Sequence, residues 1–293
     1  MATIQKLENK AYIPSSWESV NCPLCNSDQY KTYERFGDKW QYTYVLCKSC
    51  KLVYQNPRPI YNENFVHDAY DHYIFEIESM IRRDRIKFYE TEKKRFQLDI
   101  KSMLEFDKKR SAFLDVGCDV GTLLYSAKPY YKSVYGLEVS IASANIVKEM
   151  LNVDVFADKF ENVQPALKFS CISMSHVIEH IPNPNEWLAK TRSILEEDGI
   201  LVISVPNMFS LSRIVKLFFK NIGLRKGKWE SWRTPDHLFE PTLESFNLFF
   251  KNNKFDILDS YSYSKKSKYF FDKLINRKLY WGSNLRFIVK PAK

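Results

Sequence analysis

Four of the six cysteines of this 293-residue chain form two CxxC pairs, and their spacing constrains the fold more than any other feature. The pairs are Cys22-Pro-Leu-Cys25 and Cys47-Lys-Ser-Cys50, which together read C-x2-C-x21-C-x2-C. A CxxC turn places two sulfurs on one side of an ion, and two such turns supply the four tetrahedral thiolates that zinc prefers. The spacing therefore predicts a small zinc-binding module with a closed, structural metal site.

The sequence leaves other interpretations of these cysteines open. The four could be separate buried thiols, since cysteine is often buried without a metal. A redox-active pair is disfavoured, because no strand–helix pattern of the thioredoxin kind surrounds either CxxC. Asn26 and Lys51 stand where such turns often carry glycine, so we expect left-handed backbone at both positions and strain at the lysine.

The N-terminal segment and the hydropathy pattern indicate a compartment. Residues 1–20 contain no apolar core of a secretory signal, and no run of roughly 18 apolar residues occurs along the chain. We therefore expect a cytoplasmic protein, and peripheral contact with the inner membrane face stays open.

Positive charge is concentrated in the last third of the chain. Residues 211–293 hold 18 Lys and Arg against 7 Asp and Glu, whereas the preceding residues are nearly balanced. This excess suits an anionic acceptor, a nucleic acid or an anionic membrane face. Lysine-rich surfaces are also common without such partners, so charge alone does not choose among these interpretations.

From Ser111 onward, short apolar runs alternate with amphipathic stretches, which is typical of a mostly parallel sheet covered by helices. We expect a Rossmann-like α/β domain over residues 109–293, after a zinc-ribbon module over 1–58 and a helical linker over 59–108. A lysine- and aromatic-rich insertion over about 208–240 is expected to form a lid. The predicted strands are 111–116, 133–138, 152–157, 169–175, 200–205, 254–263 and 284–290, and one predicted helix runs from Pro184 to about Glu197.

A glycine-containing turn follows the first predicted strand and reads Asp115-Val-Gly117-Cys118-Asp119-Val-Gly121. Glycines there let the backbone approach a ligand, and Asp115 can accept a hydrogen bond from a ligand's amine. Glu138 ends the second predicted strand, 23 residues after Asp115, where a carboxylate can hold both hydroxyls of a ribose. The third glycine of GxGxxG is missing, which disfavours a dinucleotide.

On these residues the chain resembles the class I S-adenosylmethionine (SAM)-dependent methyltransferases, whose first motif has an acidic residue and spaced glycines. It is similar in particular to the bacterial branch with an N-terminal zinc ribbon. The shared segments are CxxCxLVYxNPRP from Cys47 to Pro59, a tyrosine-rich stretch at 61–73, VIEHIPNP from Val177 to Pro184, and DHLF with a later T-x-E-S from Asp236 to Ser245. The resemblance implies a seven-stranded methyltransferase sheet and modification of glycans, sugar nucleotides or other small molecules.

The resemblance also implies roles for single residues. Asp115, Gly117, Cys118 and Gly121 would line the methionine end of SAM, Glu138 would bind its ribose, Asp158 would lie beside the adenine, and Ser175 and His176 would lie under the sulfonium. Asp119 and Ser170 depart from the family pattern, because a glycine and an acidic residue are usual at these two positions.

Histidines after the fourth strand and in the late insertion are candidate bases. An alcohol acceptor must lose its proton as it is methylated, and a histidine that titrates near neutrality suits that task. In sugar methyltransferases that this chain resembles, a Glu-His pair after the fourth strand takes part in acid–base chemistry; here the pair is Glu179 and His180. His237 is a second candidate base, and each of the three could instead have a structural role.

We therefore expect a SAM-dependent methyltransferase that acts on a hydroxyl or carbon of a sugar, glycan or other small anionic acceptor, such as a sugar nucleotide or a lipid-linked glycan. An RNA methyltransferase and an inactive SAM-fold binding protein stay open. RNA is disfavoured because the segment from Cys22 to Cys50 holds four basic and three acidic residues. The amphipathic stretch 211–222 could be a lid or rest on an anionic membrane, and nothing indicates an oligomeric state.

Overall fold

The computed structural model describes residues 16–36, 42–60, 74, 77–222, 237–264 and 280–292. The tyrosine-rich stretch 61–73 and residues 223–236 of the predicted lid lie outside this part of the chain. The chain divides into two compact units. Unit 1 consists of Met1–Tyr61, Ile178–Asn185 and Ser204–Phe287, and unit 2 consists of Asn62–Val177, Glu186–Ile203 and Ile288–Lys293.

A seven-stranded sheet confirms the predicted Rossmann-like α/β fold. Its order is β12-β13-β10-β9-β6-β7-β8, and the neighbours β9, β6, β7 and β8 pair in parallel. All five residues of the central strand β6 are buried, as expected where both faces of a sheet are covered. The strands are β6 (Ala112–Val116), β7 (Ser133–Leu137), β8 (Asp154–Phe156), β9 (Phe169–Ser175), β10 (Leu195–Pro206), β12 (Phe255–Tyr263) and β13 (Asn284–Pro291).

The order of the strands changes direction at β6. β7 and β8 lie on one side of β6, whereas β9, the next strand along the chain, lies on the other side. Open parallel sheets bind ligands outside the carboxyl ends of the strands at such a switch point. β6 and β9 end there at Val116 and Ser175, so the predicted ligand-binding residues that follow these strands begin at the favoured place.

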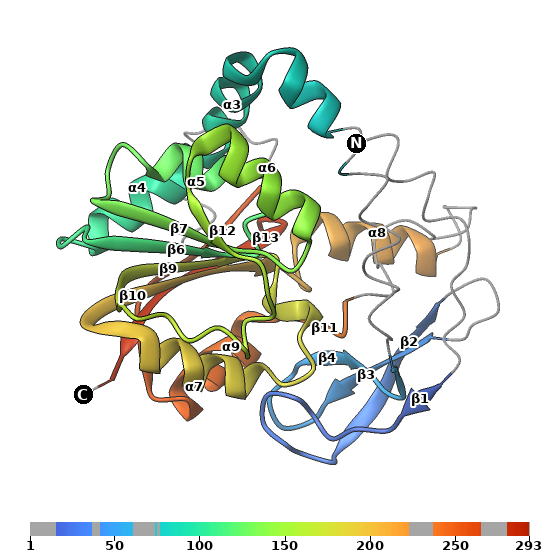
Figure 1. Ribbon diagram of the computed structural model, residues 1–293. Coiled ribbons are helices and arrows are strands. Elements are labelled where there is room, and N and C mark those ends of the chain that lie inside the picture. The colour runs from blue at the N-terminus through green and yellow to red at the C-terminus, as the bar shows by residue number, and fades with distance from the viewer. Residues whose placement is uncertain are drawn as a thin grey trace. The chain divides into compact units, whose positions relative to one another are not determined.

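Helices cover both faces of the sheet within unit 2. α4 (Gln97–Phe106), α5 (Thr122–Ala127) and α6 (Ile141–Leu151) lie on one face, and α7 (Pro184–Ile194) lies on the other (Figure 1). α3 (Arg85–Lys93), from the predicted helical linker, packs on α5. Tyr89 of α3 stacks on Tyr125 with ring centroids 5.0 Å apart and donates a hydrogen bond to the carbonyl of Val120. The predicted linker therefore contributes a buried contact to the turn that precedes α5.

One predicted boundary was wrong. The sequence placed the end of the helix that begins at Pro184 near Glu197, but α7 ends at Ile194 and β10 begins at Leu195. Leu195 is buried, and the carboxylate of Glu196 accepts a hydrogen bond from the hydroxyl of Ser111. These tertiary contacts hold the two residues in extended backbone and override the local helical pattern.

Unit 1 contains a second sheet that joins distant parts of the chain. Its order is β11-β4-β3-β2, with antiparallel pairs throughout. The strands are β2 (Tyr30–Phe36), β3 (Tyr42–Cys47), β4 (Val53–Gln55) and β11 (Phe239–Glu240). β11 pairs Phe239 with Tyr54 and Glu240 with Val53, so a strand from the late segment completes the sheet of the cysteine-bearing module. Unit 1 also holds the short pair β1 (Trp17–Glu18) and β5 (Arg58–Pro59) and the helices α8 (Leu211–Asn221) and α9 (Leu243–Asn252).

Candidate functional site

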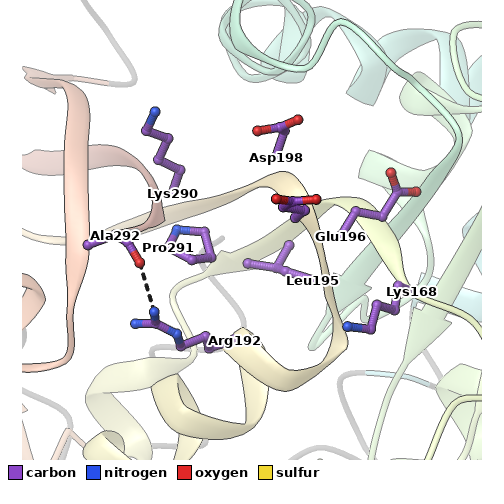
Figure 2. A pocket seen from close by; sticks show the side chains of 9 residues that line it. Lys168, Arg192, Leu195, Glu196, Asp198, Lys290, Pro291 and Ala292 are labelled. Atoms are coloured by element: carbon purple, nitrogen blue, oxygen red, sulfur yellow. Dashed lines mark hydrogen bonds between the residues drawn. The ribbon is translucent and has the colours of Figure 1, made fainter.

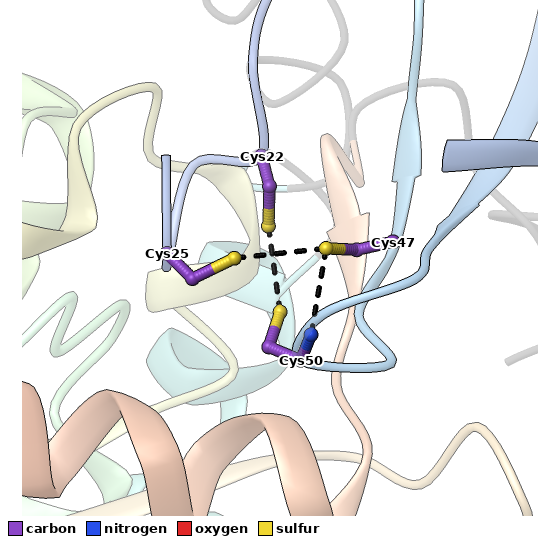
Figure 3. Close-up of side chains that lie close together, drawn as sticks. All are labelled: Cys22, Cys25, Cys47 and Cys50. Atoms are coloured by element: carbon purple, nitrogen blue, oxygen red, sulfur yellow. Dashed lines mark hydrogen bonds between the residues drawn. The ribbon is translucent and has the colours of Figure 1, made fainter. Parts of the chain in front are cut away.

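The four cysteines of unit 1 converge on one point (Figure 3). We call Cys22, Cys25, Cys47 and Cys50 the cysteine quartet. Their sulfurs lie within 4.8 Å of one another, with Cys22 Sγ 3.5 Å from Cys50 Sγ and Cys25 Sγ 3.6 Å from Cys47 Sγ. Zinc–sulfur bonds of roughly 2.3 Å place tetrahedral sulfurs roughly 3.8 Å apart, so the quartet has the size of a tetrathiolate zinc site. All four are free thiols, and no open ligand position is left for a substrate.

The turns that carry the quartet have the left-handed backbone expected from the sequence. φ is +59° at Asn26 and +61° at Lys51. The N–H groups of these residues donate to the carbonyls of Cys22 and Cys47, at 2.8 and 3.1 Å. Asparagine adopts this conformation readily and lysine does not, so the second turn carries the strain.

In unit 2, the glycine loop (Asp115–Gly121) connects β6 to α5. The N–H groups of Gly117 and Cys118 both donate to the carbonyl of Leu137, at 2.8 and 3.1 Å. The N–H of Gly121 donates to the carbonyl of Cys118 at 2.8 Å, and Gly121 is the N-cap of α5. The loop is therefore fixed to the end of β7, the residue before Glu138.

Backbone conformation and close packing both require the two glycines of this loop. φ is +71° at Gly117 and +78° at Gly121. A Cβ on Gly117 would lie 2.6 Å from Cγ2 of Val177, and one on Gly121 would lie 2.8 Å from Cδ1 of Leu151. The sequence assigned these glycines to ligand approach, but their conformation and their neighbours in unit 2 already exclude a side chain.

Three carboxyl groups lie in or beside the glycine loop. Asp115 is buried, and this burial raises its pKa well above the ordinary value, against a smaller opposing effect of the hydrogen bond with Ser173. Glu138 is also buried, and its two oxygens accept from the N–H groups of Asp119 at 2.9 Å and of Ser140 at 3.0 Å. Burial, and then the charge of Glu138, raises the pKa of Asp119 to about 7. Such a group of acids suits a ligand that brings positive charge and hydroxyl donors.

The remaining predicted donor-binding residues differ in exposure. The side chain of Cys118 is buried against the backbone of Gly136, where an added Cβ would lie 2.7 Å from its sulfur. Asp158 is exposed, and hydrogen bonds from the side chain of Asn162 and the N–H of Lys159 lower its pKa. The structure places all eight predicted residues at or just after the carboxyl ends of their strands, with Ser175 ending β9 and His176 following it at φ +58°.

In unit 1, the three predicted acid–base residues lie together. We call Glu179, His180 and His237 the histidine cluster. Their ligand atoms lie within 4.8 Å of one another, and the two imidazole rings meet edge to face with centroids 4.7 Å apart. Glu179 is fully buried in the 3-10 turn Ile178–His180. Its backbone carbonyl accepts a hydrogen bond from the N–H of Leu238 at 2.9 Å. This backbone bond joins two segments that are far apart in sequence.

Sequence reasoning missed two buried residues behind this cluster. Nδ1 of His237 lies 3.2 Å from Oε1 of Glu240, and Oε2 of Glu240 accepts from Nη1 of Arg213 at 3.0 Å. Arg213 and Glu240 are 5% and 1% exposed, so this ion pair is inside unit 1. A carboxylate at Nδ1 accepts the proton of that nitrogen, which makes Nε2 the basic nitrogen of the His237 ring. The i, i+3 spacing of His237 and Glu240 was the one sequence signal that could have indicated this contact.

The cysteine-bearing module, which consists of the quartet and strands β2, β3 and β4, holds the backbone of His237. The carbonyl of His237 accepts hydrogen bonds from the hydroxyl of Tyr44 at 2.8 Å and from Nε2 of Gln55 at 2.7 Å. Tyr44 lies on β3 and Gln55 on β4, the strands next to the cysteine quartet. The position of His237 therefore depends on the fold of the module that the quartet closes.

A hollow of about 540 Å³ in unit 2 lies elsewhere (Figure 2). Its walls include Lys168, just before β9, and Leu195, the first residue of β10. It therefore lies at the amino ends of these strands, opposite the end that carries the glycine loop. Three basic and three acidic residues line it, and Arg192 donates to the carbonyl of Ala292 at 2.8 Å, so its charges largely compensate one another.

Comparison with known proteins gives a consistent result. A family model described as a methyltransferase domain matches residues 84–260. The ubiquinone biosynthesis O-methyltransferase of Bradyrhizobium sp. (strain ORS 278) is 27% identical over 143 residues, which cover 45% of this chain and 56% of that protein. The same enzyme of Glaesserella parasuis serovar 5 is 29% identical over 106 residues, which cover 32% of this chain and 44% of that protein. The chain thus spans about half the length of these curated relatives.

Solved structures match the fold over more of the chain. A SAM-dependent methyltransferase from Clostridium acetobutylicum ATCC 824 has a TM-score of 0.52 at 13% identity and covers 76% of this chain and 99% of its own. Magnesium protoporphyrin IX methyltransferase from Synechocystis PCC 6803, solved with bound S-adenosylhomocysteine, has a TM-score of 0.51 at 12% identity and covers 79% and 100%. At these identities the likeness establishes the fold alone.

Proposed function

The chain belongs to the class I SAM-dependent methyltransferases, and from this premise we propose that it methylates a hydroxyl, or a carbon, of a sugar, glycan or other small anionic acceptor. The observation that carries the proposal is the histidine cluster, in which the ligand atoms of two imidazoles and a buried carboxylate lie within 4.8 Å of one another. A methyl group leaves the sulfonium in an in-line displacement, and a hydroxyl acceptor must lose its proton in that step. His180 or His237 takes that proton.

The donor site of this proposal is the glycine loop with its neighbours. SAM carries a positive sulfonium and an ammonium group, which suit the buried carboxyl group of Asp115 and the half-buried one of Asp119. Glu138 accepts the ribose hydroxyls with the lone pairs that its two backbone hydrogen bonds leave. Gly117, Cys118 and Gly121 would line the methionine end, Asp158 would lie beside the adenine, and Ser175 and His176 would lie under the sulfonium.

The histidine cluster works as a unit in this mechanism. Glu240 accepts from Nδ1–H of His237 and so keeps Nε2 of that ring as the acceptor of a proton. Glu179 stabilises the imidazolium that forms, because an opposite charge inside unit 1 favours the protonated ring. The buried Arg213 compensates the charge of Glu240, so this carboxylate can stay ionised behind the base.

Zinc in the cysteine quartet is the second cofactor of the proposal. The four sulfurs match a tetrahedral zinc site in number, chemistry and separation. Because four thiolates close the coordination sphere, the ion would stabilise unit 1 and take no part in methyl transfer.

Substitution of the two histidines tests the base. The purified 293-residue chain is incubated with SAM and a panel of sugar nucleotides, soluble glycans and phenols, and formation of S-adenosylhomocysteine is measured. For the best acceptor, we expect His180→Ala or His237→Ala to lower kcat about 100-fold or more. SAM affinity, measured by calorimetry, should stay within about threefold of wild type, because donor binding lies in unit 2. Full activity of both variants would show that neither histidine is the base.

The histidine cluster also has the donor set of a divalent metal site, two histidines and one carboxylate. A metal ion there would bind the acceptor oxygen and lower its pKa, and the histidines would be ligands instead of bases. Added Mg²⁺ or Mn²⁺ after dialysis against a chelator distinguishes the two mechanisms, with zinc content followed by mass spectrometry. Activity that returns with these ions at constant zinc content favours the metal; activity that ignores them favours the base.

A further inference from the structure

Helix α8 exposes the apolar side of an amphipathic pattern. Leu211, Ile214, Val215, Phe218, Phe219 and Ile222 are between 41% and 59% exposed. Their spacing of i, i+3, i+4, i+7, i+8 and i+11 places all six on one stripe of the helix, which we call the apolar stripe. In a globular protein such a stripe normally faces the core, so its exposure marks a surface that binds something.

The opposite side of α8 is anchored inside unit 1 by a charge. Arg213 is 5% exposed, and its guanidinium pairs with the buried carboxylate of Glu240 at 3.0 Å. A buried pair of this kind is strongly destabilised when one partner leaves it, so the helix cannot easily turn its apolar stripe inward. The buried Arg213–Glu240 pair therefore fixes the rotation of α8 that leaves the six apolar side chains exposed.

Two aromatic side chains extend the apolar stripe beyond the start of α8. Phe209 and Trp281 are each 43% exposed. The N–H of Leu211 donates to the carbonyl of Trp281 at 3.1 Å, and the side chain of Asn207 donates to the carbonyls that flank it, at Tyr280 and Gly282. These bonds hold the tryptophan beside the first turn of the helix. Tryptophan and phenylalanine at the rim of an apolar surface are typical of the interface between water and lipid.

Charge indicates which partner fits this surface. The chain from Leu211 to its end holds 18 basic against 7 acidic residues; Arg213 and Arg286 are buried, and Lys216 lies exposed on the flank of the apolar stripe. Basic residues near an anionic lipid surface are attracted to it, while apolar side chains enter the boundary of the acyl chains. In the described part of the chain, no helix is long and apolar enough to cross a membrane.

We propose that the apolar stripe of α8, with Phe209 and Trp281, docks on an anionic lipid surface. The helix lies in the plane of the interface, with its apolar side chains among the lipids and Arg213 anchored to Glu240 behind it. This docking goes beyond methyl transfer and needs neither SAM nor an acceptor, so it can fail while the proposed function holds.

Vesicle binding of the 293-residue chain tests the proposal. Sedimentation is measured with neutral phosphatidylcholine vesicles and with vesicles that contain about one quarter phosphatidylglycerol. We expect at least about tenfold tighter binding to the anionic vesicles, weakened by salt. Phe218→Glu removes the most exposed side chain of the apolar stripe and should lower binding about tenfold or more.

Ile86→Glu is the matched control, because Ile86 is 68% exposed on α3 and lies outside the apolar stripe. It should bind vesicles as wild type does, and both variants should keep the melting temperature and SAM affinity of wild type. The proposal is overturned if wild type binds neither kind of vesicle, or if Phe218→Glu binds as tightly as wild type. A role of the apolar stripe as a lid would instead change the KM of a soluble acceptor in Phe218→Glu, and a role as a dimer contact would change the oligomeric state. Either result, together with no vesicle binding by wild type, also overturns the proposal.

Discussion

The glycine loop of unit 2 and the histidine cluster of unit 1 are built in different ways. The loop uses consecutive residues between a strand and a helix, and its own backbone and Glu138 hold it in place. The cluster joins Glu179 and His180 to His237, and strands of the cysteine-bearing module fix the backbone of His237. A site made from one local motif depends on local backbone geometry, whereas an assembled site depends on everything that holds its parts together.

This difference gives the cysteine quartet a role in the proposed chemistry. The quartet closes the turns next to β3 and β4, and β4 pairs with β11, which follows His237 directly. Zinc in the quartet would therefore support the histidine cluster without touching it. Damage to one unit should then spare the site in the other.

The largest expected effect is that of Cys47→Ser. Loss of one of four thiolates should abolish zinc binding and destabilise unit 1 by about 5 kcal/mol or more, because the binding energy of a structural zinc is folding energy. Turnover should be lost along with the histidine cluster, while SAM binding by unit 2 stays within about threefold of wild type. Zinc content, thermal melting and calorimetry with SAM measure the three effects. If SAM affinity were lost as well, the two sites would not be separable.

Gly117→Ala damages unit 2 instead of unit 1, and we expect it to lower the free energy of unfolding by about 2–4 kcal/mol. The new methyl group would meet Val177 at 2.6 Å, and alanine is strained at φ +71°. SAM affinity should fall at least about tenfold, whereas zinc content and the melting of unit 1 should stay as in wild type. Gly282→Ala is the control in unit 1, where a Cβ would lie 2.5 Å from the backbone of Tyr263 and SAM affinity should be kept. Unchanged SAM affinity in Gly117→Ala would contradict the role of the loop.

Much of this contrast could be predicted from the sequence, for a physical reason. The cysteine spacing, the glycine loop and Glu138 are local patterns; the structure brings the four sulfurs together and places the loop and Glu138 at the ends of β6 and β7. The Arg213–Glu240 pair and the bonds of Tyr44 and Gln55 to His237 depend on the pairing of β4 with β11, which no local pattern encodes. The boundary between α7 and β10 was wrong because sheet contacts outweigh helix propensity there.

A smaller, pH-dependent effect is expected from Asp119→Asn. The folded-state pKa of Asp119 is raised from 3.8 to about 7, chiefly by burial and next by the charge of Glu138. A raised pKa means that this group supports the fold at low pH and that the support is lost as the pH rises through about 7. Asp119→Asn should therefore stabilise the protein by about 1–2 kcal/mol at roughly pH 8 and by much less at roughly pH 4.

Thermal melts of wild type and Asp119→Asn across this range measure that difference. Asp259→Asn is the control, since Asp259 lies on β12 in unit 1, outside the glycine loop. A difference between wild type and Asp119→Asn that is the same at both pH values would mean that folding does not raise the pKa of Asp119.

The smallest expected effect concerns the turn of the cysteine quartet that carries strain. Lys51 has φ +61°, a conformation that costs a residue with a side chain roughly 1–2 kcal/mol and costs glycine almost nothing. Glycine also makes the unfolded chain more flexible, which offsets part of this gain in stability. Lys51→Gly should therefore stabilise unit 1 by about 0.5–1 kcal/mol, although it also removes the hydrogen bond from Lys51 Nζ to the carbonyl of Lys48. Asn26→Gly, at φ +59° in the other turn, should change stability by only a few tenths of a kcal/mol, because asparagine tolerates this conformation. Denaturant unfolding of zinc-loaded protein compares the two, and equal gains would mean that the strain is not specific to the lysine. A gain in the stability of Lys51→Gly without any change in SAM affinity would again show that the stability of unit 1 is independent of the glycine loop of unit 2.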